Sequence, residues 1–331
     1  MTSNTILTLG RYVTIQPKEH HGKKGALFRI ADPPSNPIGA DAMAQIYEGT
    51  KILRDKCGEY KDFVIFYSMP AKAHVGANIK EFAGEIDPEW ALRHTLEGAF
   101  AANIVKKLKP RTIGVMDGAG RYGGSVEWPL WAQYVVAAND VTISLPEVTL
   151  ALIPGWAGIA RIEYKAGKDN AAYLCSTGET IDAETARKMG IVNIVVPQKD
   201  ALNTALDLAV ADEKDIPAVA TVGEYVPVAI ADLETKLKDN PLLGPRAVEA
   251  VKNVVYGKHD FEMALSYIKT LVDEHFPGFG HIVDELAEPD QKYDAKYIIG
   301  AIDCSRLMQT EDRKIGVDAF LKKQKPAFIG Q

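Results

Sequence analysis

Two glutamates, Glu127 and Glu147, are the side chains of this sequence best placed for proton transfer. Apolar residues flank both, among them Trp128 and Leu130 beside the first and Val148 beside the second. A carboxyl group that such neighbours keep from bulk water has a raised pKa, which suits a general acid or base near neutral pH. Either glutamate alone would most simply be a solvated or helix-capping residue, so the pair matters more than its members.

Two loops rich in small residues accompany this pair. One contains Gly76 and Ala77, and the other runs from Gly118 to Gly124, just before Glu127. Small residues let backbone N–H groups approach a ligand, and two such groups can converge on one oxygen atom. The spacing of the second loop matches neither a dinucleotide-binding fingerprint nor a Walker loop. Glycine content alone favours two tight turns, whereas a glutamate beside one of the loops favours an oxyanion-binding site.

The apolar pattern of the first third predicts alternating strands and helices. We expect strands at Ala26–Ile30, Phe63–Tyr67 and Thr112–Met116, and helices at Ala40–Cys57 and Glu89–Leu108. This alternation is typical of right-handed crossovers and a mainly parallel sheet, to which Ile191–Val196 adds a strand. Ligands of open α/β sheets bind beyond the carboxyl ends of the strands, which is where both glycine-containing loops stand.

The pattern becomes mainly helical from about residue 200 onward. Helices are predicted at Ala201–Ala211, Pro245–Val255, Phe261–Glu274 and Thr310–Lys322, with loops at Val222–Pro227 and Phe276–Gly280. We therefore predict an α/β core that spans residues 1–200 and holds the active site, followed by a helical region at residues 201–331.

The composition excludes several classes of protein. The chain has 331 residues, 47% of them hydrophobic and 25% charged, which is typical of a globular enzyme. Its net charge of −6 disfavours a nucleic-acid partner, and no apolar run approaches the ~18 residues of a membrane span. The N-terminal segment lacks the features of a secretion signal, so we expect a cytoplasmic protein. Three widely spaced cysteines indicate neither a disulfide framework nor a metal site.

Several motifs, in their order along the chain, resemble the enoyl-CoA hydratase/isomerase (crotonase) superfamily. The segment VGANIKEF at Val75–Phe82 resembles the oxyanion loop of that superfamily, and Gly118–Glu127 resembles its glycine-rich signature. Further similar segments follow in the same order at Leu145–Glu147, Ile153–Gly158, Thr177–Val192, Thr310–Gly316 and Lys325–Phe328. The resemblance implies an α/β, crotonase-like (ClpP/crotonase) spiral fold of repeated ββα units with a helical C-terminal trimerisation region.

The resemblance also implies roles for individual residues. The backbone N–H groups of Ala77 and Gly124 would hold a thioester oxygen, and Glu127 and Glu147 would share a water as the acid–base pair. Residues expected to bind the acyl group are His74, Gly76, Tyr122, Gly123, Trp128 and Trp156, and those expected to meet the phosphates of CoA are Lys80 and Lys323. CoA would be part of the substrate, so neither a cofactor nor a metal is expected. A homotrimer or homohexamer is implied, with the C-terminal helices covering the pocket and packing across subunits.

The chain departs from the superfamily pattern at several positions near the site. Asn78 stands where an aspartate is usual, Arg121 and Tyr122 lengthen the glycine loop, and the bulky Trp128 and Trp156 replace smaller residues. These aromatic side chains favour a cyclic or bulky acyl group over a short straight chain. Plainer alternatives remain for single residues: a polar surface position for His74, packing for the tryptophans, and a solvated basic face for the lysines.

The predicted activity is the hydration of a 2,3-enoyl-CoA. One alternative is a C–C hydrolase that opens a ring or cleaves a β-oxoacyl-CoA through the same stabilised enolate. Another is an enoyl-CoA isomerase, which normally needs only one of the two carboxylates. A member kept only for binding or assembly is disfavoured because both Glu127 and Glu147 are present.

Overall fold

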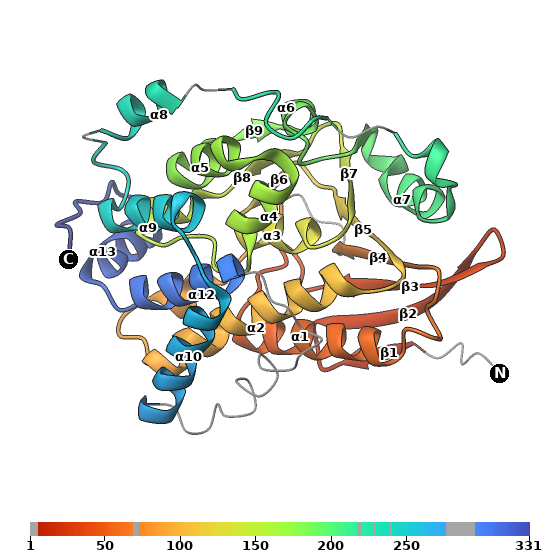
Figure 1. Cartoon of the computed structure of the whole chain (residues 1–331), viewed down its shortest axis with the longest axis horizontal. Coiled ribbons are helices and arrows are strands. Elements are labelled where there is room, and N and C mark those ends of the chain that lie inside the picture. The colour runs from red at the N-terminus through yellow and green to blue at the C-terminus, as the bar shows by residue number, and fades with distance from the viewer. Residues whose placement is uncertain (1–5, 69–72, 218–219, 228–229, 239, 276–294) are drawn as a thin grey trace.

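The central element of the computed structural model is a seven-stranded sheet (Figure 1). The structure describes residues 6–331 except 69–72, 218–219, 228–229, 239 and 276–294. The strands follow the order β1-β2-β3-β4-β5-β7-β10, parallel from β3 to β10 and antiparallel at the edge formed by β1 and β2. Their bounds are β1 Leu7–Leu9, β2 Val13–His20, β3 Lys23–Ile30, β4 Phe63–Ser68, β5 Arg111–Met116, β7 Tyr134–Ala138 and β10 Ile194–Val196. The predicted parallel sheet is confirmed.

Helices occupy most of the remaining described chain. The α-helices are α1 Ala40–Asp55, α2 Pro88–Lys107, α3 Gly124–Leu130, α4 Gly158–Ala166, α5 Lys168–Thr177, α6 Ala183–Met189, α7 Ala201–Val210, α8 Ile230–Leu237, α9 Pro245–Tyr256, α10 Phe261–His275, α12 Ala295–Leu307 and α13 Glu311–Leu321. The 3₁₀ helices are η1 Ile79–Phe82, η2 Pro146–Leu150, η3 Gln198–Asp200 and η4 Glu213–Asp215.

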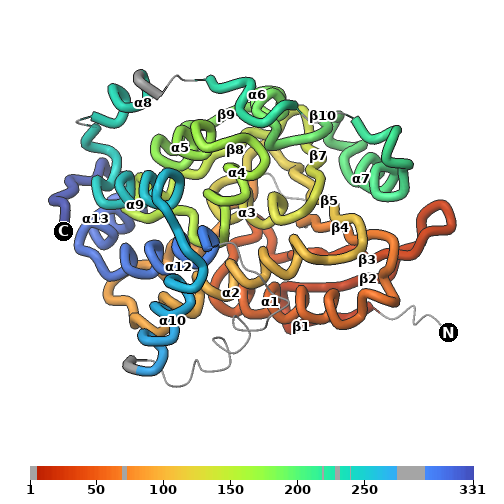
Figure 2. Tube along the Cα trace, in the orientation of Figure 1, coloured from red at the N-terminus to blue at the C-terminus, as the bar shows by residue number. Residues whose placement is uncertain are grey.

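Alternating side chains of the sheet face two different helical layers. On β4, Val64 and Phe66 belong to the core cluster that includes residues of α1 and α2. Phe63 and Ile65 point the other way and pack with residues of α7. Successive side chains of a strand point to opposite faces, so a continuous apolar strand requires a helix on each side. Figure 2 shows α1 and α2 side by side and α7 apart from them.

A second, small sheet holds the glycine-rich segment in place. It consists of β6 Gly120–Tyr122, β8 Thr142–Ser144 and β9 Ile181–Asp182, in that order. His74 forms an isolated parallel bridge with Arg121 on β6, through bonds from the His74 N–H to Gly120 O at 2.8 Å and from the Tyr122 N–H to His74 O at 3.0 Å. The two loops predicted to bind one oxygen are therefore joined through their backbones. Strands of two or three residues are too short for sequence periodicity to reveal.

The C-terminal helices pack on the core. Helices α9, α10 and α13 were predicted and are confirmed, whereas the expected loop at Phe276–Gly280 lies outside the described residues. The sequence pattern did not indicate α12, which packs on both α2 and α9. Its buried residues include Tyr297, Ile298, Ala301 and Ile302, and burial on several sides leaves little amphipathic periodicity. The division of the chain at residue 200 stays a prediction.

Asp87 caps the first turn of α2. Its side chain accepts a hydrogen bond from the Trp90 N–H at 2.9 Å, and Pro88 occupies the first helical position. Replacing Asp87 with alanine leaves this N–H without its acceptor, so we expect the free energy of unfolding to fall by about 1 kcal/mol. Denaturant unfolding measures the loss, and Asp87→Ser, which keeps a capping oxygen, is the control. An equal loss in both variants would contradict the capping role.

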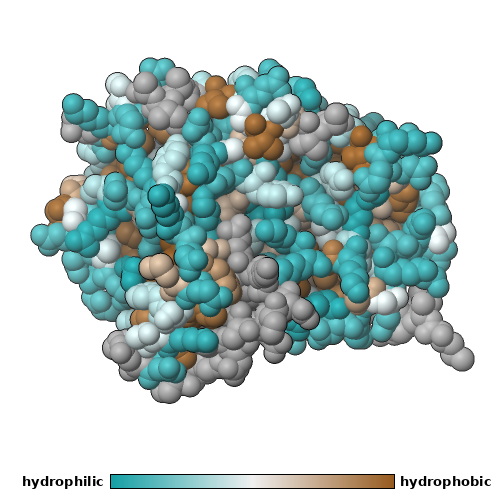
Figure 3. All heavy atoms as spheres, in the orientation of Figure 1, coloured by the Kyte–Doolittle hydropathy of each residue, from teal (hydrophilic) through white to brown (hydrophobic). Residues whose placement is uncertain are grey.

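None of the described helices combines the length and the hydropathy of a bilayer span. The face of the molecule drawn in Figure 3 is largely hydrophilic, with apolar residues in small separate groups.

Candidate active site

A small cavity of about 40 Å³ lies between α2, α3, η2 and α12. Both predicted acid–base residues, Glu127 and Glu147, line this cavity. Ala77 and Gly124, the predicted oxyanion donors, line it as well. Most of the remaining wall is apolar. The structure thus brings together the four residues to which the sequence assigned the chemistry.

Glu127 is held on α3 in a fixed orientation. The residue is 2% exposed, and its Oε1 accepts hydrogen bonds from the Trp156 and Gly158 N–H groups, both at 2.9 Å. These donors lie where the chain enters α4, and the first N–H groups of a helix have no acceptor within it. Burial raises the pKa of Glu127 to about 7, although the two N–H bonds act in the opposite direction. The carboxyl is therefore poised to exchange a proton near neutral pH.

Glu147 lies on η2 and is the weaker acid of the two. Its Oε2 is buried and has no hydrogen-bond partner within the described part of the chain. Burial raises the pKa of Glu147 well above its usual value, and the charge of Glu127 raises it further. Glu127, which two N–H groups stabilise as an anion, therefore ionises first, and Glu147 holds its proton more tightly.

Replacing Glu127 with glutamine changes how stability depends on pH. Because burial raises the pKa of Glu127 from 4.5 to about 7, the folded protein binds more protons than the unfolded chain between these values. The carboxyl consequently destabilises the fold as the pH rises through this window, and glutamine removes that cost. We expect Glu127→Gln to gain up to about 3 kcal/mol relative to the wild type between about pH 5 and about pH 8.

Urea unfolding of both proteins across this range measures the gain. Lys165, whose pKa burial lowers to about 7, does not interact with Glu127, so its contribution is common to both proteins and cancels in the difference. Stability curves that run parallel from acid to neutral pH would contradict a raised pKa of Glu127.

The predicted oxyanion donors lie at the junction of the two glycine-containing loops. Gly76 has a φ of +70°, and a Cβ atom there would lie 2.7 Å from the Gly124 nitrogen and overlap the Tyr122 carbonyl oxygen. Only glycine fits this close approach without strain. Neither the Ala77 nor the Gly124 N–H donates to an acceptor among the described residues. Gly124 is the first residue of α3, so its N–H has no acceptor within the helix.

Arg121 supports this junction from the protein interior. Its side chain is fully buried, with Nη2 donating to Asp117 Oδ1 at 2.6 Å and Nη1 donating to the Ser125 carbonyl oxygen at 3.2 Å. Ser125 Oγ in turn accepts a hydrogen bond from the Tyr122 N–H at 2.8 Å. The guanidinium therefore fixes the start of α3, and with it the direction of the Gly124 N–H.

His74 belongs to this supporting network, so its predicted contact with the acyl group must be corrected. The side chain is 1% exposed, and its ring nitrogens lie 3.1 Å from Asn36 Nδ2 and 3.5 Å from Asp117 Oδ1. Burial is the largest influence on the pKa of His74 and lowers it. Its burial rules out a polar surface position, and His74 is not among the described residues that line the cavity.

The tryptophans divide between the cavity and the core. Trp156 lines the cavity as expected, and its ring packs against Gly124 closely enough that a Cβ there would overlap it. The expectation for Trp128 must be corrected: it is 2% exposed within the core and does not line the cavity, because neighbouring residues on a helix point about 100° apart. Trp131 is also buried and supports Trp156 by donating from Nε1 to its carbonyl oxygen at 2.8 Å.

The remaining predicted residues are not among the described residues that line the cavity. A Cβ on Gly123 would lie 2.9 Å from Glu147 Oε1, so this glycine also permits a close approach. Tyr122 is 36% exposed, and Lys80 and Lys323 are exposed. The roles proposed for Tyr122 and for the two lysines stay predictions.

Comparison with known proteins decides the family. A sequence model of the family described as enoyl-CoA hydratase/isomerase matches residues 28–231, which is more than half of the chain. The chain belongs to the enoyl-CoA hydratase/isomerase family. The alpha subunit of the fatty acid oxidation complex from Pseudomonas putida (strain GB-1) is 35% identical over 189 residues, which make up 56% of this chain and 25% of that subunit. The chain thus spans about a quarter of the length of this relative.

Solved structures confirm the crotonase fold of this family member. An enoyl-CoA hydratase from Bacillus anthracis superposes with a TM-score of 0.52 at 20% identity, over 97% of this chain and 100% of the other. A methylmalonyl-CoA decarboxylase in complex with 2-nitronate-propionyl-CoA superposes with a TM-score of 0.58 at 19% identity, over 97% and 99% of the two chains. Proteins named for two different reactions share this fold, so the reaction of this family member must be argued from its own site.

Sequence reasoning missed His94 on α2, which also lines the cavity of this hydratase/isomerase family member. It is 2% exposed, and its ring stacks on Trp90 with a centroid separation of 5.0 Å. The spacing of Trp90 and His94, four residues apart in a predicted helix, places both on one face and was the available signal.

Two other features of this family member have the residues or the volume of a possible binding site. A larger groove of about 820 Å³ is lined by residues of α8 and α9 together with Ala327 and Phe328, and shares no lining residue with the cavity. Among the described residues that line the groove, the one carboxyl is that of Glu234, which is paired with Lys252. The smaller cavity, which holds two carboxyls, therefore remains the candidate active site despite its size.

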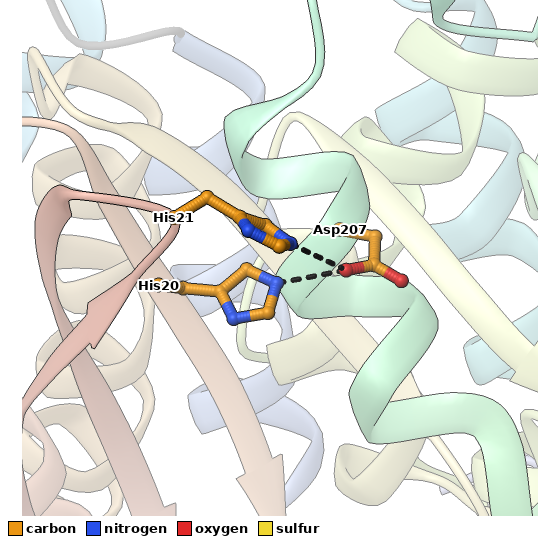
Figure 4. Close-up of side chains that lie close together, drawn as sticks. All are labelled: His20, His21 and Asp207. Atoms are coloured by element: carbon orange, nitrogen blue, oxygen red, sulfur yellow. Dashed lines mark hydrogen bonds and ion pairs between the residues drawn. The ribbon is translucent and has the colours of Figure 1, made fainter.

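The second feature is a surface cluster of His20, His21 and Asp207 (Figure 4). His20 Nε2 and His21 Nε2 lie 2.7 Å and 3.8 Å from the same oxygen, Asp207 Oδ1. These contacts join the β2–β3 hairpin to α7. Because His21 and Asp207 are largely exposed and the carboxylate already contacts both imidazoles, a surface ion pair accounts for the cluster.

Proposed function

We propose that this protein hydrates a 2,3-enoyl-CoA thioester. The observation that carries the proposal is that the carboxyls of Glu127 and Glu147 line the same cavity as two residues whose backbone N–H groups have no acceptor in the described part of the chain. These two residues are Ala77 and Gly124. Family membership supports acyl-CoA chemistry in general, and the pair of carboxyls favours hydration within it. A double-bond isomerase normally needs only one of them.

In the proposed reaction, the thioester oxygen binds between the N–H groups of Ala77 and Gly124. Attack at the β-carbon moves electron density onto this oxygen and forms an enolate. Hydrogen bonds that are already oriented toward the developing charge are among the largest contributions that a protein makes to such a step. The support of Gly124 by Arg121 keeps this orientation fixed.

The two carboxyls carry the protons in opposite directions. Glu127, which ionises first, accepts a proton from water as the water oxygen bonds to the β-carbon. Glu147, which holds its proton more tightly, donates it to the α-carbon as the enolate collapses. One proton leaves the water and one reaches the product, so Glu127 ends protonated and Glu147 ends ionised. A proton transfer from Glu127 to Glu147 then restores the starting state.

The size of the cavity supports water as the reactant between the carboxyls. A buried water needs about 10–15 Å³ of such space, so 40 Å³ admits a water but not an acyl chain. The acyl group must therefore enter by displacing side chains of the wall. Trp156 is the bulky side chain that touches Gly124, and it alone of the three tryptophans near the signature motif supports a preference for a particular acyl shape.

The proposal extends to the rest of the substrate and to assembly. CoA is part of the substrate, so the reaction needs no cofactor, and Lys80 and Lys323 are proposed to meet its phosphates. A homotrimer or homohexamer in which the C-terminal helices pack between subunits is likewise proposed on the strength of family membership.

A mass-spectrometric screen tests the proposed function. Purified protein is incubated with linear and cyclic 2,3-enoyl-CoA thioesters and, separately, with cyclic β-oxoacyl-CoA thioesters. We expect at least one enoyl-CoA to gain one water. A gain of water only by the β-oxo compounds, with a new carboxylate, would replace hydration by C–C hydrolysis. An unchanged mass with a moved double bond would identify an isomerase.

A further inference from the structure

Aromatic rings surround the imidazole of His94, whose two ring nitrogens are buried. Its ring stacks on Trp90 at an interplanar angle of 10°, and meets the edges of Phe82 and Trp156 at centroid distances of 5.7 Å and 5.2 Å. Neither ring nitrogen has a hydrogen-bond partner in the part of the chain that the structure describes. The backbone is tied in as well, because Trp156 Nε1 donates to the His94 carbonyl oxygen at 3.2 Å.

This arrangement is unfavourable for the protein alone. A buried polar group without a partner loses the hydrogen bonds that it makes to water in the unfolded chain, and an apolar side chain of similar size would avoid that cost. Burial lowers the pKa of His94 to about 4, so the imidazole is neutral at pH 7 and offers one donor and one acceptor. Such an imidazole pairs with a water in the cavity or with a polar group of a ligand that displaces that water.

The imidazole belongs to the wall of the catalytic cavity. His94 lines it together with Glu127 and Glu147, the other titratable lining group being the thiol of Cys304. The rest of the wall is mainly apolar, with Phe82, Leu152 and other carbon side chains. A hydrocarbon acyl group would leave both nitrogens of His94 unpaired, whereas an acyl group with an oxygen substituent could pair with one of them.

The charge of the cavity selects the kind of oxygen. The described residues that line it include two carboxyls and no lysine or arginine. A substrate carboxylate would add a buried negative charge without a cation to balance it, which is strongly unfavourable. A hydroxyl or carbonyl oxygen carries no such cost, and a neutral imidazole can bond to either.

We propose that His94 is a specificity-determining residue that hydrogen-bonds a neutral oxygen substituent of the acyl group, beyond its β-carbon. The preferred substrates are then oxygenated acyl-CoA thioesters, not plain hydrocarbon ones. This inference rests on the proposed function, because it requires that the acyl group of a CoA thioester enters this cavity.

Binding of unreactive thioesters tests the inference without requiring turnover. The probes are saturated acyl-CoA thioesters of increasing chain length, each paired with counterparts that carry one hydroxyl or keto group beyond the β-carbon. Calorimetry gives the dissociation constant of each for the wild type, for His94→Leu and for His94→Gln, which keeps a donor and an acceptor. We expect the wild type to bind the best oxygenated thioester at least about 10-fold more tightly than its hydrocarbon partner.

The two variants separate a hydrogen bond from a structural role. In His94→Leu we expect the preference for the oxygenated thioester to fall to about 1, and in His94→Gln we expect part of the preference to remain. The melting temperature of His94→Leu should equal or exceed that of the wild type, since the unpaired nitrogens are gone. Equal binding of both thioesters by the wild type, or equal weakening of both by His94→Leu, would overturn the inference alone. If no CoA thioester binds, the proposed function fails and the inference fails with it.

Discussion

Glutamine in place of Glu127 or Glu147 is expected to lower the turnover of the best enoyl-CoA substrate by at least about 10²-fold. This is the usual magnitude for the loss of a general acid or base, and the near-isosteric change should leave the fold intact. Steady-state kinetics of each variant, with circular dichroism to confirm folding, measure the effect. The kcat/KM of the wild type should rise with pH as Glu127 ionises, with a pKa of about 7 in the free enzyme. This rise should vanish in Glu127→Gln.

Glu97 supplies the matched control for this experiment. It lies on α2, and burial raises its pKa to about 7, as for Glu127, yet it does not line the cavity. Glu97→Gln should therefore keep its turnover within a few-fold of the wild type. Full activity of both Glu127→Gln and Glu147→Gln would show that the two carboxyls do not carry the protons.

Alanine in place of Gly76 is expected to lower turnover by about 10²–10³-fold, the range found when one oxyanion donor is lost. The added Cβ would lie 2.7 Å from the Gly124 nitrogen and overlap the Tyr122 carbonyl oxygen, so the two loops must move apart. The N–H groups of Ala77 and Gly124 would then no longer converge on one oxygen. The loss should appear in kcat, because these bonds strengthen as the enolate forms.

Gly84 separates this effect from simple backbone strain. Its φ of +69° nearly equals that of Gly76, but a Cβ there meets nothing within 4 Å. The left-handed backbone should cost both alanine variants about 1–2 kcal/mol of stability. The overlap at residue 76 should destabilise Gly76→Ala further, and only this variant should lose activity. Equal turnover by the two variants would show that the junction of the loops is not part of the catalytic machinery.

Sequence reasoning succeeded where local pattern and chemistry agree. Buried strands such as Phe63–Tyr67 and long helices such as Pro245–Val255 have strong periodicity, and their predicted bounds differ from the observed ones by one residue. The cavity brings Glu127 and Glu147 together although β7 and β8 separate them in the chain. Their apolar neighbours indicated burial, and the raised pKa values of both carboxyls follow from it.

Sequence reasoning failed where tertiary contacts decide the direction of a side chain. Trp128 follows Glu127 directly, yet helical geometry turns the two to different sides. His74 stands beside the Gly76 loop, but a backbone bridge to Arg121 draws it into the interior. His94 lines the cavity with Trp156, which comes from a distant segment and packs against its ring. The bridge and the ring packing join segments that are distant in the sequence, so local patterns do not indicate them.

The origin of the added atoms tests the central claim most directly. The wild-type enzyme is incubated with its best enoyl-CoA in water that carries both heavy oxygen and deuterium, and the product is fragmented in the mass spectrometer. Hydration by the Glu127–Glu147 pair predicts one heavy oxygen on the β-carbon and one deuterium on the α-carbon, in equal amounts. A product with deuterium but no solvent oxygen, or with the oxygen in a new carboxylate, would contradict hydration.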